Sequence, residues 1–237
     1  MHEGLRQQQF WEEAWVRHIE QYLRTPPRAG LWLAARFRLQ GWRVLEIAGG
    51  SCRDSRHLAE RGVDAIGSDF DQKTLDYLAQ RFPQSPLRLA REDAMALSLP
   101  DQSVDLSVHN GFWVLFADDA QVLALMREQA RVTRRVMVAL VHNADNHRLR
   151  TTFADKARSD ALYDIRFFRR AELPALVAAS GIALRRLRLE KFGGPIDRLL
   201  SWPWPAPLAR LVQWAVPRLY RFLPWAWVER VALVIER

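Results

Sequence analysis

The chain has 237 residues, of which 49% are hydrophobic and 26% charged, the balance of an ordinary globular protein. This composition excludes a disordered or collagen-like chain, and the single cysteine, Cys52, excludes an internal disulfide and a cysteine-based metal site. The net charge of +8 comes mainly from arginines, which are scattered rather than clustered, so we expect no nucleic-acid partner. No stretch reaches the roughly 18 uninterrupted apolar residues of a membrane span, and the first residues resemble no export signal, so we expect a cytoplasmic protein.

Helical spacing of apolar residues predicts a helix near the N-terminus, with Trp11, Trp15 and Ile19 on one face. A second helix is predicted over residues 30–40. We therefore expect residues 1–40 to form a helical cap on the rest of the chain.

From residue 42 onward, short aliphatic runs alternate with helical segments. Strands are predicted over residues 42–47, 63–67, 87–90, 104–108, 136–141, 182–190 and 226–235, and helices over 53–61, 71–82, 119–131 and 172–180. This alternation implies βαβ units, and hence a Rossmann-like, doubly wound α/β fold in which helices cover both faces of a mostly parallel, seven-stranded sheet. We expect a single domain with its core in residues 42–192 and 225–237, and a Trp-, Pro- and Arg-rich insert at 193–224.

The turn after the first predicted strand has few bulky side chains. The segment Val44–Arg53 passes through Ala48-Gly49-Gly50, which lets backbone N–H groups and a helix N-terminus face a ligand. Asp69 comes 19 residues after Gly50, just past the second strand, where a carboxylate can accept both ribose hydroxyls of a nucleoside. Asp93 follows the third strand and can accept a hydrogen bond from an adenine amine. The pattern predicts a nucleoside site at this edge of the sheet.

Four blocks of sequence resemble, in order and spacing, the class I S-adenosylmethionine-dependent methyltransferases, most closely their type 11 group. The blocks are Val44–Arg53, Gly67–Asp71, Asp93–Val108 and Glu128–Val132, within about residues 42–143. The resemblance implies a methyltransferase with S-adenosylmethionine as cofactor and an antiparallel last strand. No metal is expected, because His and Asp residues do not fall at ligand spacing.

The resemblance also implies roles for individual residues. Glu46 would brace the loop and reach the methionine ammonium, and Asp69 would hold the ribose hydroxyls. Phe70 would pack on the adenine face, and Asp93, with the backbone of Ala94, would read the adenine amine. The other expected cofactor contacts are Ala48, Gly49, Gly50, Cys52, His109 and Asn110.

Two residues depart from the family's pattern, since Ala48 and Cys52 stand where it has its first and third glycines. Ala48 fits if its φ is negative and clashes if φ must be positive. Cys52 would place a sulfur near the methionine moiety. This altered loop motivates an alternative hypothesis, a non-catalytic protein of the same fold that binds a partner or a nucleoside ligand.

Methyl transfer from a sulfonium is an in-line displacement, which needs a base only where the acceptor must lose a proton. His109, after the fourth strand, is the first candidate for this base, and His142, after the fifth, is the second; either can instead be a wall residue. Phe112 and Trp113 can line an apolar pocket. We expect the acceptor to offer an oxygen or a nitrogen and to be a small molecule or lipid-linked.

Residues 198–228 contain four arginines, no acidic residue and half of the ten tryptophans. Trp and Arg beside an apolar helix face are typical of a membrane-interface element, and equally of a lid over the acceptor or a homodimer patch. Peripheral contact with the inner membrane surface, a lid and a homodimer all remain open. The N-terminal helix, with Phe10, Trp11 and Trp15, is expected either to cover the cofactor or to pack on the core.

Overall fold

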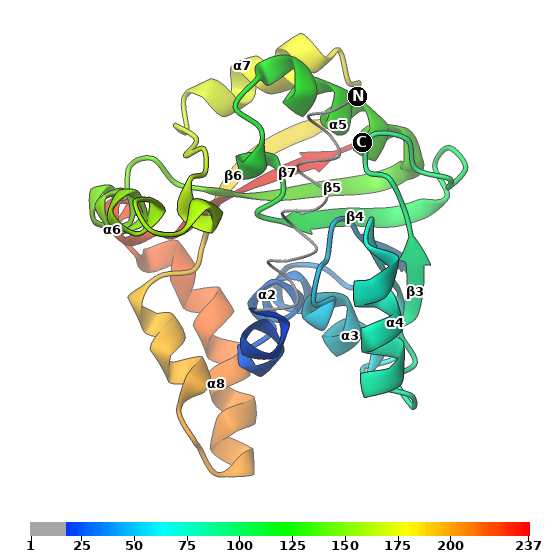
Figure 1. The fold of residues 1–237 in the computed structure, drawn as a ribbon, viewed down its shortest axis with the longest axis vertical. Coiled ribbons are helices and arrows are strands. Elements are labelled where there is room, and N and C mark those ends of the chain that lie inside the picture. Colours follow the sequence, from blue (N-terminus) through cyan, green and yellow to red (C-terminus); the bar gives the residue numbers. More distant parts are fainter. Residues whose placement is uncertain (1–17) are drawn as a thin grey trace.

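The structure is a computed structural model that describes residues 18–237, so Phe10, Trp11 and Trp15 lie outside the described residues. Seven strands form one sheet in the order β3-β2-β1-β4-β5-β7-β6 (Figure 1). The strands are β1 (Arg43–Glu46), β2 (Asp64–Asp69), β3 (Arg88–Arg91), β4 (Val104–Asn110), β5 (Thr133–His142), β6 (Arg186–Phe192) and β7 (Arg230–Glu236). Strands β1 to β5 are parallel, whereas β7 runs antiparallel to both β5 and β6. The predicted sheet is confirmed.

Helices cover both faces of this sheet (Figure 1). They are α2 (Arg28–Arg36), α3 (Arg53–Ala59), α4 (Gln72–Arg81), α5 (Asp119–Val132), α6 (His147–Ala157), α7 (Glu172–Ser180) and α8 (Ala206–Leu219), with short 3-10 turns η1 (Trp113–Leu115), η2 (Ala161–Tyr163), η3 (Pro195–Ser201), η4 (Tyr220–Phe222) and η5 (Trp225–Trp227). Residues 18–24 are also helical. The sequence analysis predicted neither α6 nor α8 as a separate long element. Helix α6 buries none of its residues, so it lacks the apolar stripe that reveals a helix.

Alternate residues of β5 feed two separate cores. Val138 and Leu140 pack with Trp32 of α2 on one face of the sheet. Met137 and Ala139 pack on the other face, in the core that contains α5 and α7. Because both faces are covered, β5 is apolar without alternation, as expected of a central strand.

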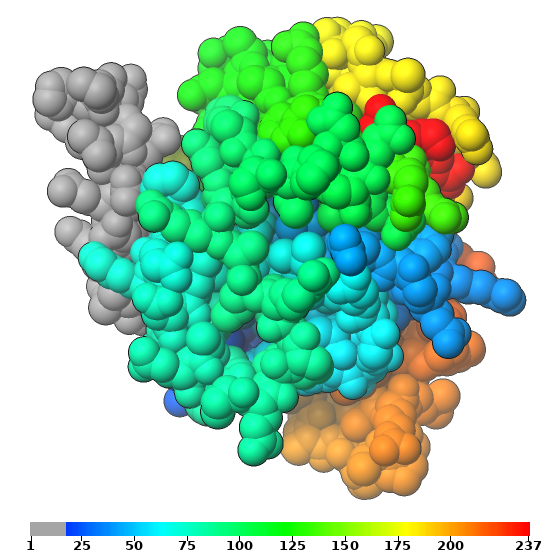
Figure 2. All heavy atoms as spheres, turned by 90° about the vertical axis from the view of Figure 1, so that its right-hand side faces the viewer, coloured from blue at the N-terminus to red at the C-terminus, as the bar shows by residue number. Residues whose placement is uncertain are grey.

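The insert leaves the sheet after β6 and returns before β7. Its helix α8 and the turn η3 extend away from the sheet as a projection (Figures 1 and 2). At its base, Arg28 of α2 donates to both carboxylate oxygens of Glu229, at 2.7 and 2.9 Å, and to Asp197 of η3. Tyr220 donates to the same Asp197 at 2.5 Å. Burial alone would raise the pKa of Glu229, but the Arg28 charge dominates and the pKa is lowered.

Candidate active site

A cavity of about 780 Å³ lies at the carboxyl ends of the parallel strands, where strand order reverses between β1 and β4. We call its part along β1 to β3 the nucleoside half, lined by Glu46, Ala48, Gly49, Ser51, Arg53, Asp54, Asp69, Phe70, Asp71, Glu92, Asp93, Ala94 and Met95. We call the rest the aromatic half, lined by Asn110, Gly111, Phe112, Val114, Leu115, Phe116, Gln121, His142, Phe153, Leu162, Tyr163, Ile165 and Arg230. His18, Gln21, Tyr22 and Thr25 complete the wall.

Most of the predicted cofactor residues therefore meet in one space. Glu46, Ala48, Gly49, Asp69, Phe70, Asp93, Ala94 and Asn110 all line the cavity, as does the predicted base His142. Gly50, Cys52 and His109 do not line it.

Asp69 ends β2 and faces the loop that follows β1. Its carboxylate accepts hydrogen bonds from the backbone N–H of Gly50 at 2.7 Å and of Asp71 at 3.1 Å. Burial raises its pKa in spite of these bonds. A carboxylate has about four acceptor positions, so two remain for a ligand.

Phe70 and Asp93 lie on the same wall. The ring of Phe70 is 42% exposed although it belongs to a cavity, and the Arg91 guanidinium lies 5.6 Å from its centre. An exposed ring in a cavity offers a face on which a flat base can stack. Asp93 accepts from the backbone N–H of Met95 at 2.8 Å, which orients its carboxylate.

The loop after β1 adopts the left-handed conformation at every second residue, with φ of 49° at Ala48, 52° at Gly50 and 43° at Cys52. Ala48 was expected to fit only with a negative φ, and that expectation is wrong: the side chain is accommodated among apolar residues such as Leu45 and Ile47. A non-glycine residue held in this region costs on the order of 1 kcal/mol. The loop therefore keeps the shape for which three glycines would be suited, with strain at two positions.

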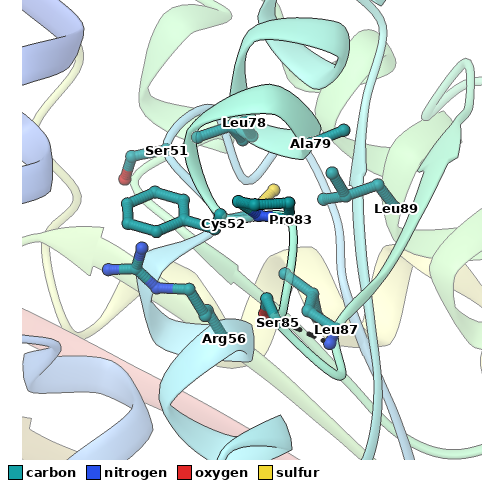
Figure 3. A pocket seen from close by; sticks show the side chains of 10 residues that line it. Ser51, Cys52, Arg56, Leu78, Ala79, Pro83, Ser85, Leu87 and Leu89 are labelled. Carbon is teal, nitrogen blue, oxygen red and sulfur yellow. Dashed lines mark hydrogen bonds between the residues drawn. The ribbon is translucent and has the colours of Figure 1, made fainter.

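Cys52 was expected to place its sulfur near a methionine moiety, and the structure corrects this. The buried side chain points instead into a smaller cavity of about 230 Å³ between α3, α4 and β3, where it packs with Leu78 (Figure 3). Gly67 of β2 makes room for it, since an added Cβ there would lie 2.9 Å from the Cys52 Cβ. Burial raises the pKa of the thiol well above its ordinary value, so Cys52 is a packing residue.

Glu46 and Asp54 form an acidic pair at the floor of the nucleoside half. Glu46 accepts from the backbone N–H of Ser55 at 2.9 Å, and burial together with the Asp54 charge raises the pKa of Glu46 to about 7. Asp54 accepts from the backbone N–H of Gly30 at 2.9 Å and from Asn110 at 3.2 Å. Sequence analysis missed Asp54, whose only local signal is its place in the first turn of a helix after the loop.

His109 lies on the wrong side of the sheet for the role predicted for it. Strand β4 continues through Asn110, so neighbouring residues point to opposite faces. Asn110 reaches the cavity, whereas the His109 ring is 4.6 Å from that of Trp113 in the core. Burial, with the Arg230 charge, lowers the pKa of His109 to about 3, so it is a neutral core residue.

His142 and Arg230 are paired across β5 and β7 and both line the aromatic half. The imidazole lies between the rings of Phe153 and Phe167, at 5.2 and 5.4 Å. Burial and the Arg230 charge hold the pKa of His142 well below its ordinary value, so it is neutral. Its Nδ1 has no hydrogen-bond partner within residues 18–237.

Arg230 is the cation of the aromatic half and was missed by sequence analysis. It donates to the side-chain oxygen of Asn110 and its Nε lies 3.4 Å from Glu229. Gly111 lets it approach closely, because a Cβ there would lie 3.5 Å from a guanidinium nitrogen. Burial lowers its pKa, but a guanidinium remains charged at neutral pH.

Aromatic rings form the rest of this half. Phe112 packs edge-on against Phe116 at 5.2 Å, and Phe153 against Tyr163 at 5.3 Å. Phe112 thus lines the pocket as predicted, whereas Trp113 is buried in the core.

The insert does not close this cavity. No residue of 193–224 lines it, so the structure does not support the predicted lid. Across residues 18–237, no helix has both the length and the apolar character needed to cross a membrane.

Comparison with solved structures defines the class of this fold. A SAM-dependent methyltransferase from Archaeoglobus fulgidus has 16% identity and a TM-score of 0.59, with 100% of each chain covered. A SAM-dependent methyltransferase from Thermotoga maritima, described as a possible histamine N-methyltransferase, has 16% identity and a TM-score of 0.62, with 93% of this chain and 96% of that chain covered. Magnesium protoporphyrin IX methyltransferase from Synechocystis, with bound SAH, has 13% identity and a TM-score of 0.54, over 93% and 83%. The chain therefore has the fold of S-adenosylmethionine-dependent methyltransferases.

The family follows from the sequence itself. Residues 44–135 match the family model of a methyltransferase domain and belong to that family. No curated protein matches the sequence. The resemblance seen in the four sequence blocks is confirmed.

Proposed function

We propose that the protein transfers the methyl group of S-adenosylmethionine to an oxygen or nitrogen of a small-molecule or lipid-linked acceptor held in the aromatic half. The observation that carries this proposal is that one continuous cavity joins the two halves. Carboxylates and an exposed ring fit a nucleoside at one end, and a neutral imidazole lies in an apolar pocket at the other.

The nucleoside half fits this cofactor in charge as well as shape. Glu46, Asp54 and Asp69 lie together, and their ionised forms are disfavoured by burial or by each other. An ammonium and a sulfonium placed beside them would relieve this repulsion. When bound, the cofactor supplies an electrophilic methyl group on a positively charged sulfur.

In the aromatic half, His142 is the residue that we propose to accept a proton from the acceptor. It is neutral, faces the cavity and has a ring nitrogen with no partner in the described part of the chain. Arg230 beside it would hold an anionic or carbonyl group of the acceptor. The surrounding rings exclude water and orient the acceptor's apolar body.

Two measurements test the proposal. Calorimetry with S-adenosylhomocysteine should show binding to the wild type. Radiolabelled S-adenosylmethionine, incubated with the protein and either an aqueous metabolite extract or a lipid extract, should then yield a labelled product in one of them. Binding without any labelled product in either extract favours the non-catalytic alternative, and absence of binding of both nucleosides overturns the proposal.

A further inference from the structure

The insert carries most of the large apolar side chains that the described residues expose. Of twelve such side chains, eight lie between residues 199 and 227: Leu199, Trp202, Leu208, Leu211, Trp214, Leu219, Phe222 and Trp227. Trp202, Trp214 and Phe222 are exposed by 65%, 58% and 69%. Apolar groups gathered in this way on a projection indicate an interaction surface.

Helix α8 is apolar on two sides. Val212 and Val216 face the core of the protein. Leu208, Leu211 and Trp214 follow one another at spacings of three and are exposed. A helix that is apolar all round is normally buried, so the outer side of α8 lacks a cover in the isolated chain. The turn 202–205, which joins η3 to α8, forms the far end of the projection (Figure 1).

The charge around this surface has one sign. Arg198, Arg210, Arg218 and Arg221 lie between residues 198 and 228, which contain no acid. Arg218 lies over the ring of Trp214 at 4.4 Å, and Arg221 over that of Phe222 at 4.6 Å. The nearest acids along the chain, Asp197 and Glu229, are both bound to Arg28 at the base. The surface therefore presents uncompensated cations next to aromatic rings.

We propose that this surface docks the protein on an anionic lipid bilayer. Exposed Trp and Phe fit the interfacial layer of a membrane, and the arginines fit its phosphate groups. A second copy of the chain is a poor occupant, because a two-fold interface would set the same four arginines against one another without an acid to pair with them. The proposal is independent of methyl transfer.

Sedimentation with lipid vesicles tests the proposal. The protein should pellet with vesicles of phosphatidylcholine and phosphatidylglycerol at low salt, but not with phosphatidylcholine alone, and high salt should weaken binding. The double variant Arg210→Gln/Arg221→Gln should bind about 30-fold more weakly, since each arginine near an anionic surface contributes about a factor of five. The variant Trp202→Ser/Trp214→Ser should also lose binding.

The variant Arg185→Gln/Arg186→Gln is the matched control. It removes the same charge at exposed positions outside the insert and should bind as the wild type does. Thermal melts followed by circular dichroism should show that all variants fold. Three results would overturn the proposal: no pelleting with anionic vesicles, equal weakening in the control, or a dimer in ultracentrifugation that the tryptophan variant dissociates.

Discussion

The two halves of the cavity are built in different ways. The nucleoside half comes from the carboxyl ends of three neighbouring strands, and its acids are oriented by backbone N–H groups within a few residues or on the adjacent loop. The aromatic half is assembled from β5, α6, η2 and β7, which are distant in the chain. One half is thus determined by local sequence and the other by tertiary packing, so each should respond to its own substitutions.

His142→Gln should have the largest effect and should be confined to the aromatic half. Removing a positioned base typically lowers turnover by about 10²- to 10⁴-fold. The affinity for S-adenosylhomocysteine should not change, because His142 is not part of the nucleoside half. Turnover of the acceptor found by labelling, together with calorimetry, measures both. The matched variant His109→Gln should keep much more turnover than His142→Gln; equal loss in the two would exclude a special role for His142.

Asp69→Asn should act on the other half. A carboxamide offers one acceptor oxygen in place of two to Gly50, Asp71 and a ribose, so affinity for S-adenosylhomocysteine should fall about 100-fold, because hydrogen bonds to charged groups contribute about 1.5–3 kcal/mol each. Calorimetry provides the measurement. The exposed Asp76→Asn on α4 is the control and should bind normally. Unchanged affinity in Asp69→Asn would contradict the assignment of this half.

Glu46→Gln should change the pH dependence of stability of the ligand-free protein. The folded pKa of about 7 lies above the ordinary value of 4.5, so the folded state binds the proton more tightly. That stabilisation is complete below the ordinary value and is lost as pH rises through about 7. Gln avoids this loss, so its Tm should exceed the wild-type Tm by at least about 2 °C at pH 8 and converge with it at pH 4. A difference that is the same at both pH values would show that ionisation is not its cause.

Ala48→Gly should give the smallest effect. Glycine adopts the φ of 49° without strain, so the free energy of unfolding should rise by about 0.5–1 kcal/mol, less whatever packing the methyl group provides. Urea denaturation measures the change. A lower stability would mean that the methyl contact outweighs the strain.

The same contrast explains how far sequence could go. The order of strands and the acids at 46, 69 and 93 follow from local patterns, since each acid sits just where a strand ends. Arg230 could not be found in this way, because its neighbour in space, Asn110, is 120 residues away. Asp54 was missed because its partner Gly30 belongs to a different helix.

The wrong predictions arise from details of one residue. The end of β4 was placed at residue 108 rather than 110, which left His109 in a loop instead of inside the strand. Since side chains alternate along a strand, its last residues decide which side chain faces the cavity. Similarly, the φ angles at Ala48 and Cys52 depend on the whole loop, not on the residue type at each position.

The Arg28 cluster at the base of the insert has a mechanical consequence. A single guanidinium holds Asp197, near the start of the projection, and Glu229, just after its end. With both feet clasped at one point, the projection has little freedom to pivot. Glu229 is also the immediate neighbour of Arg230, so a molecule attached through its projection would hold the mouth of its cavity at a set height and tilt above whatever it rests on.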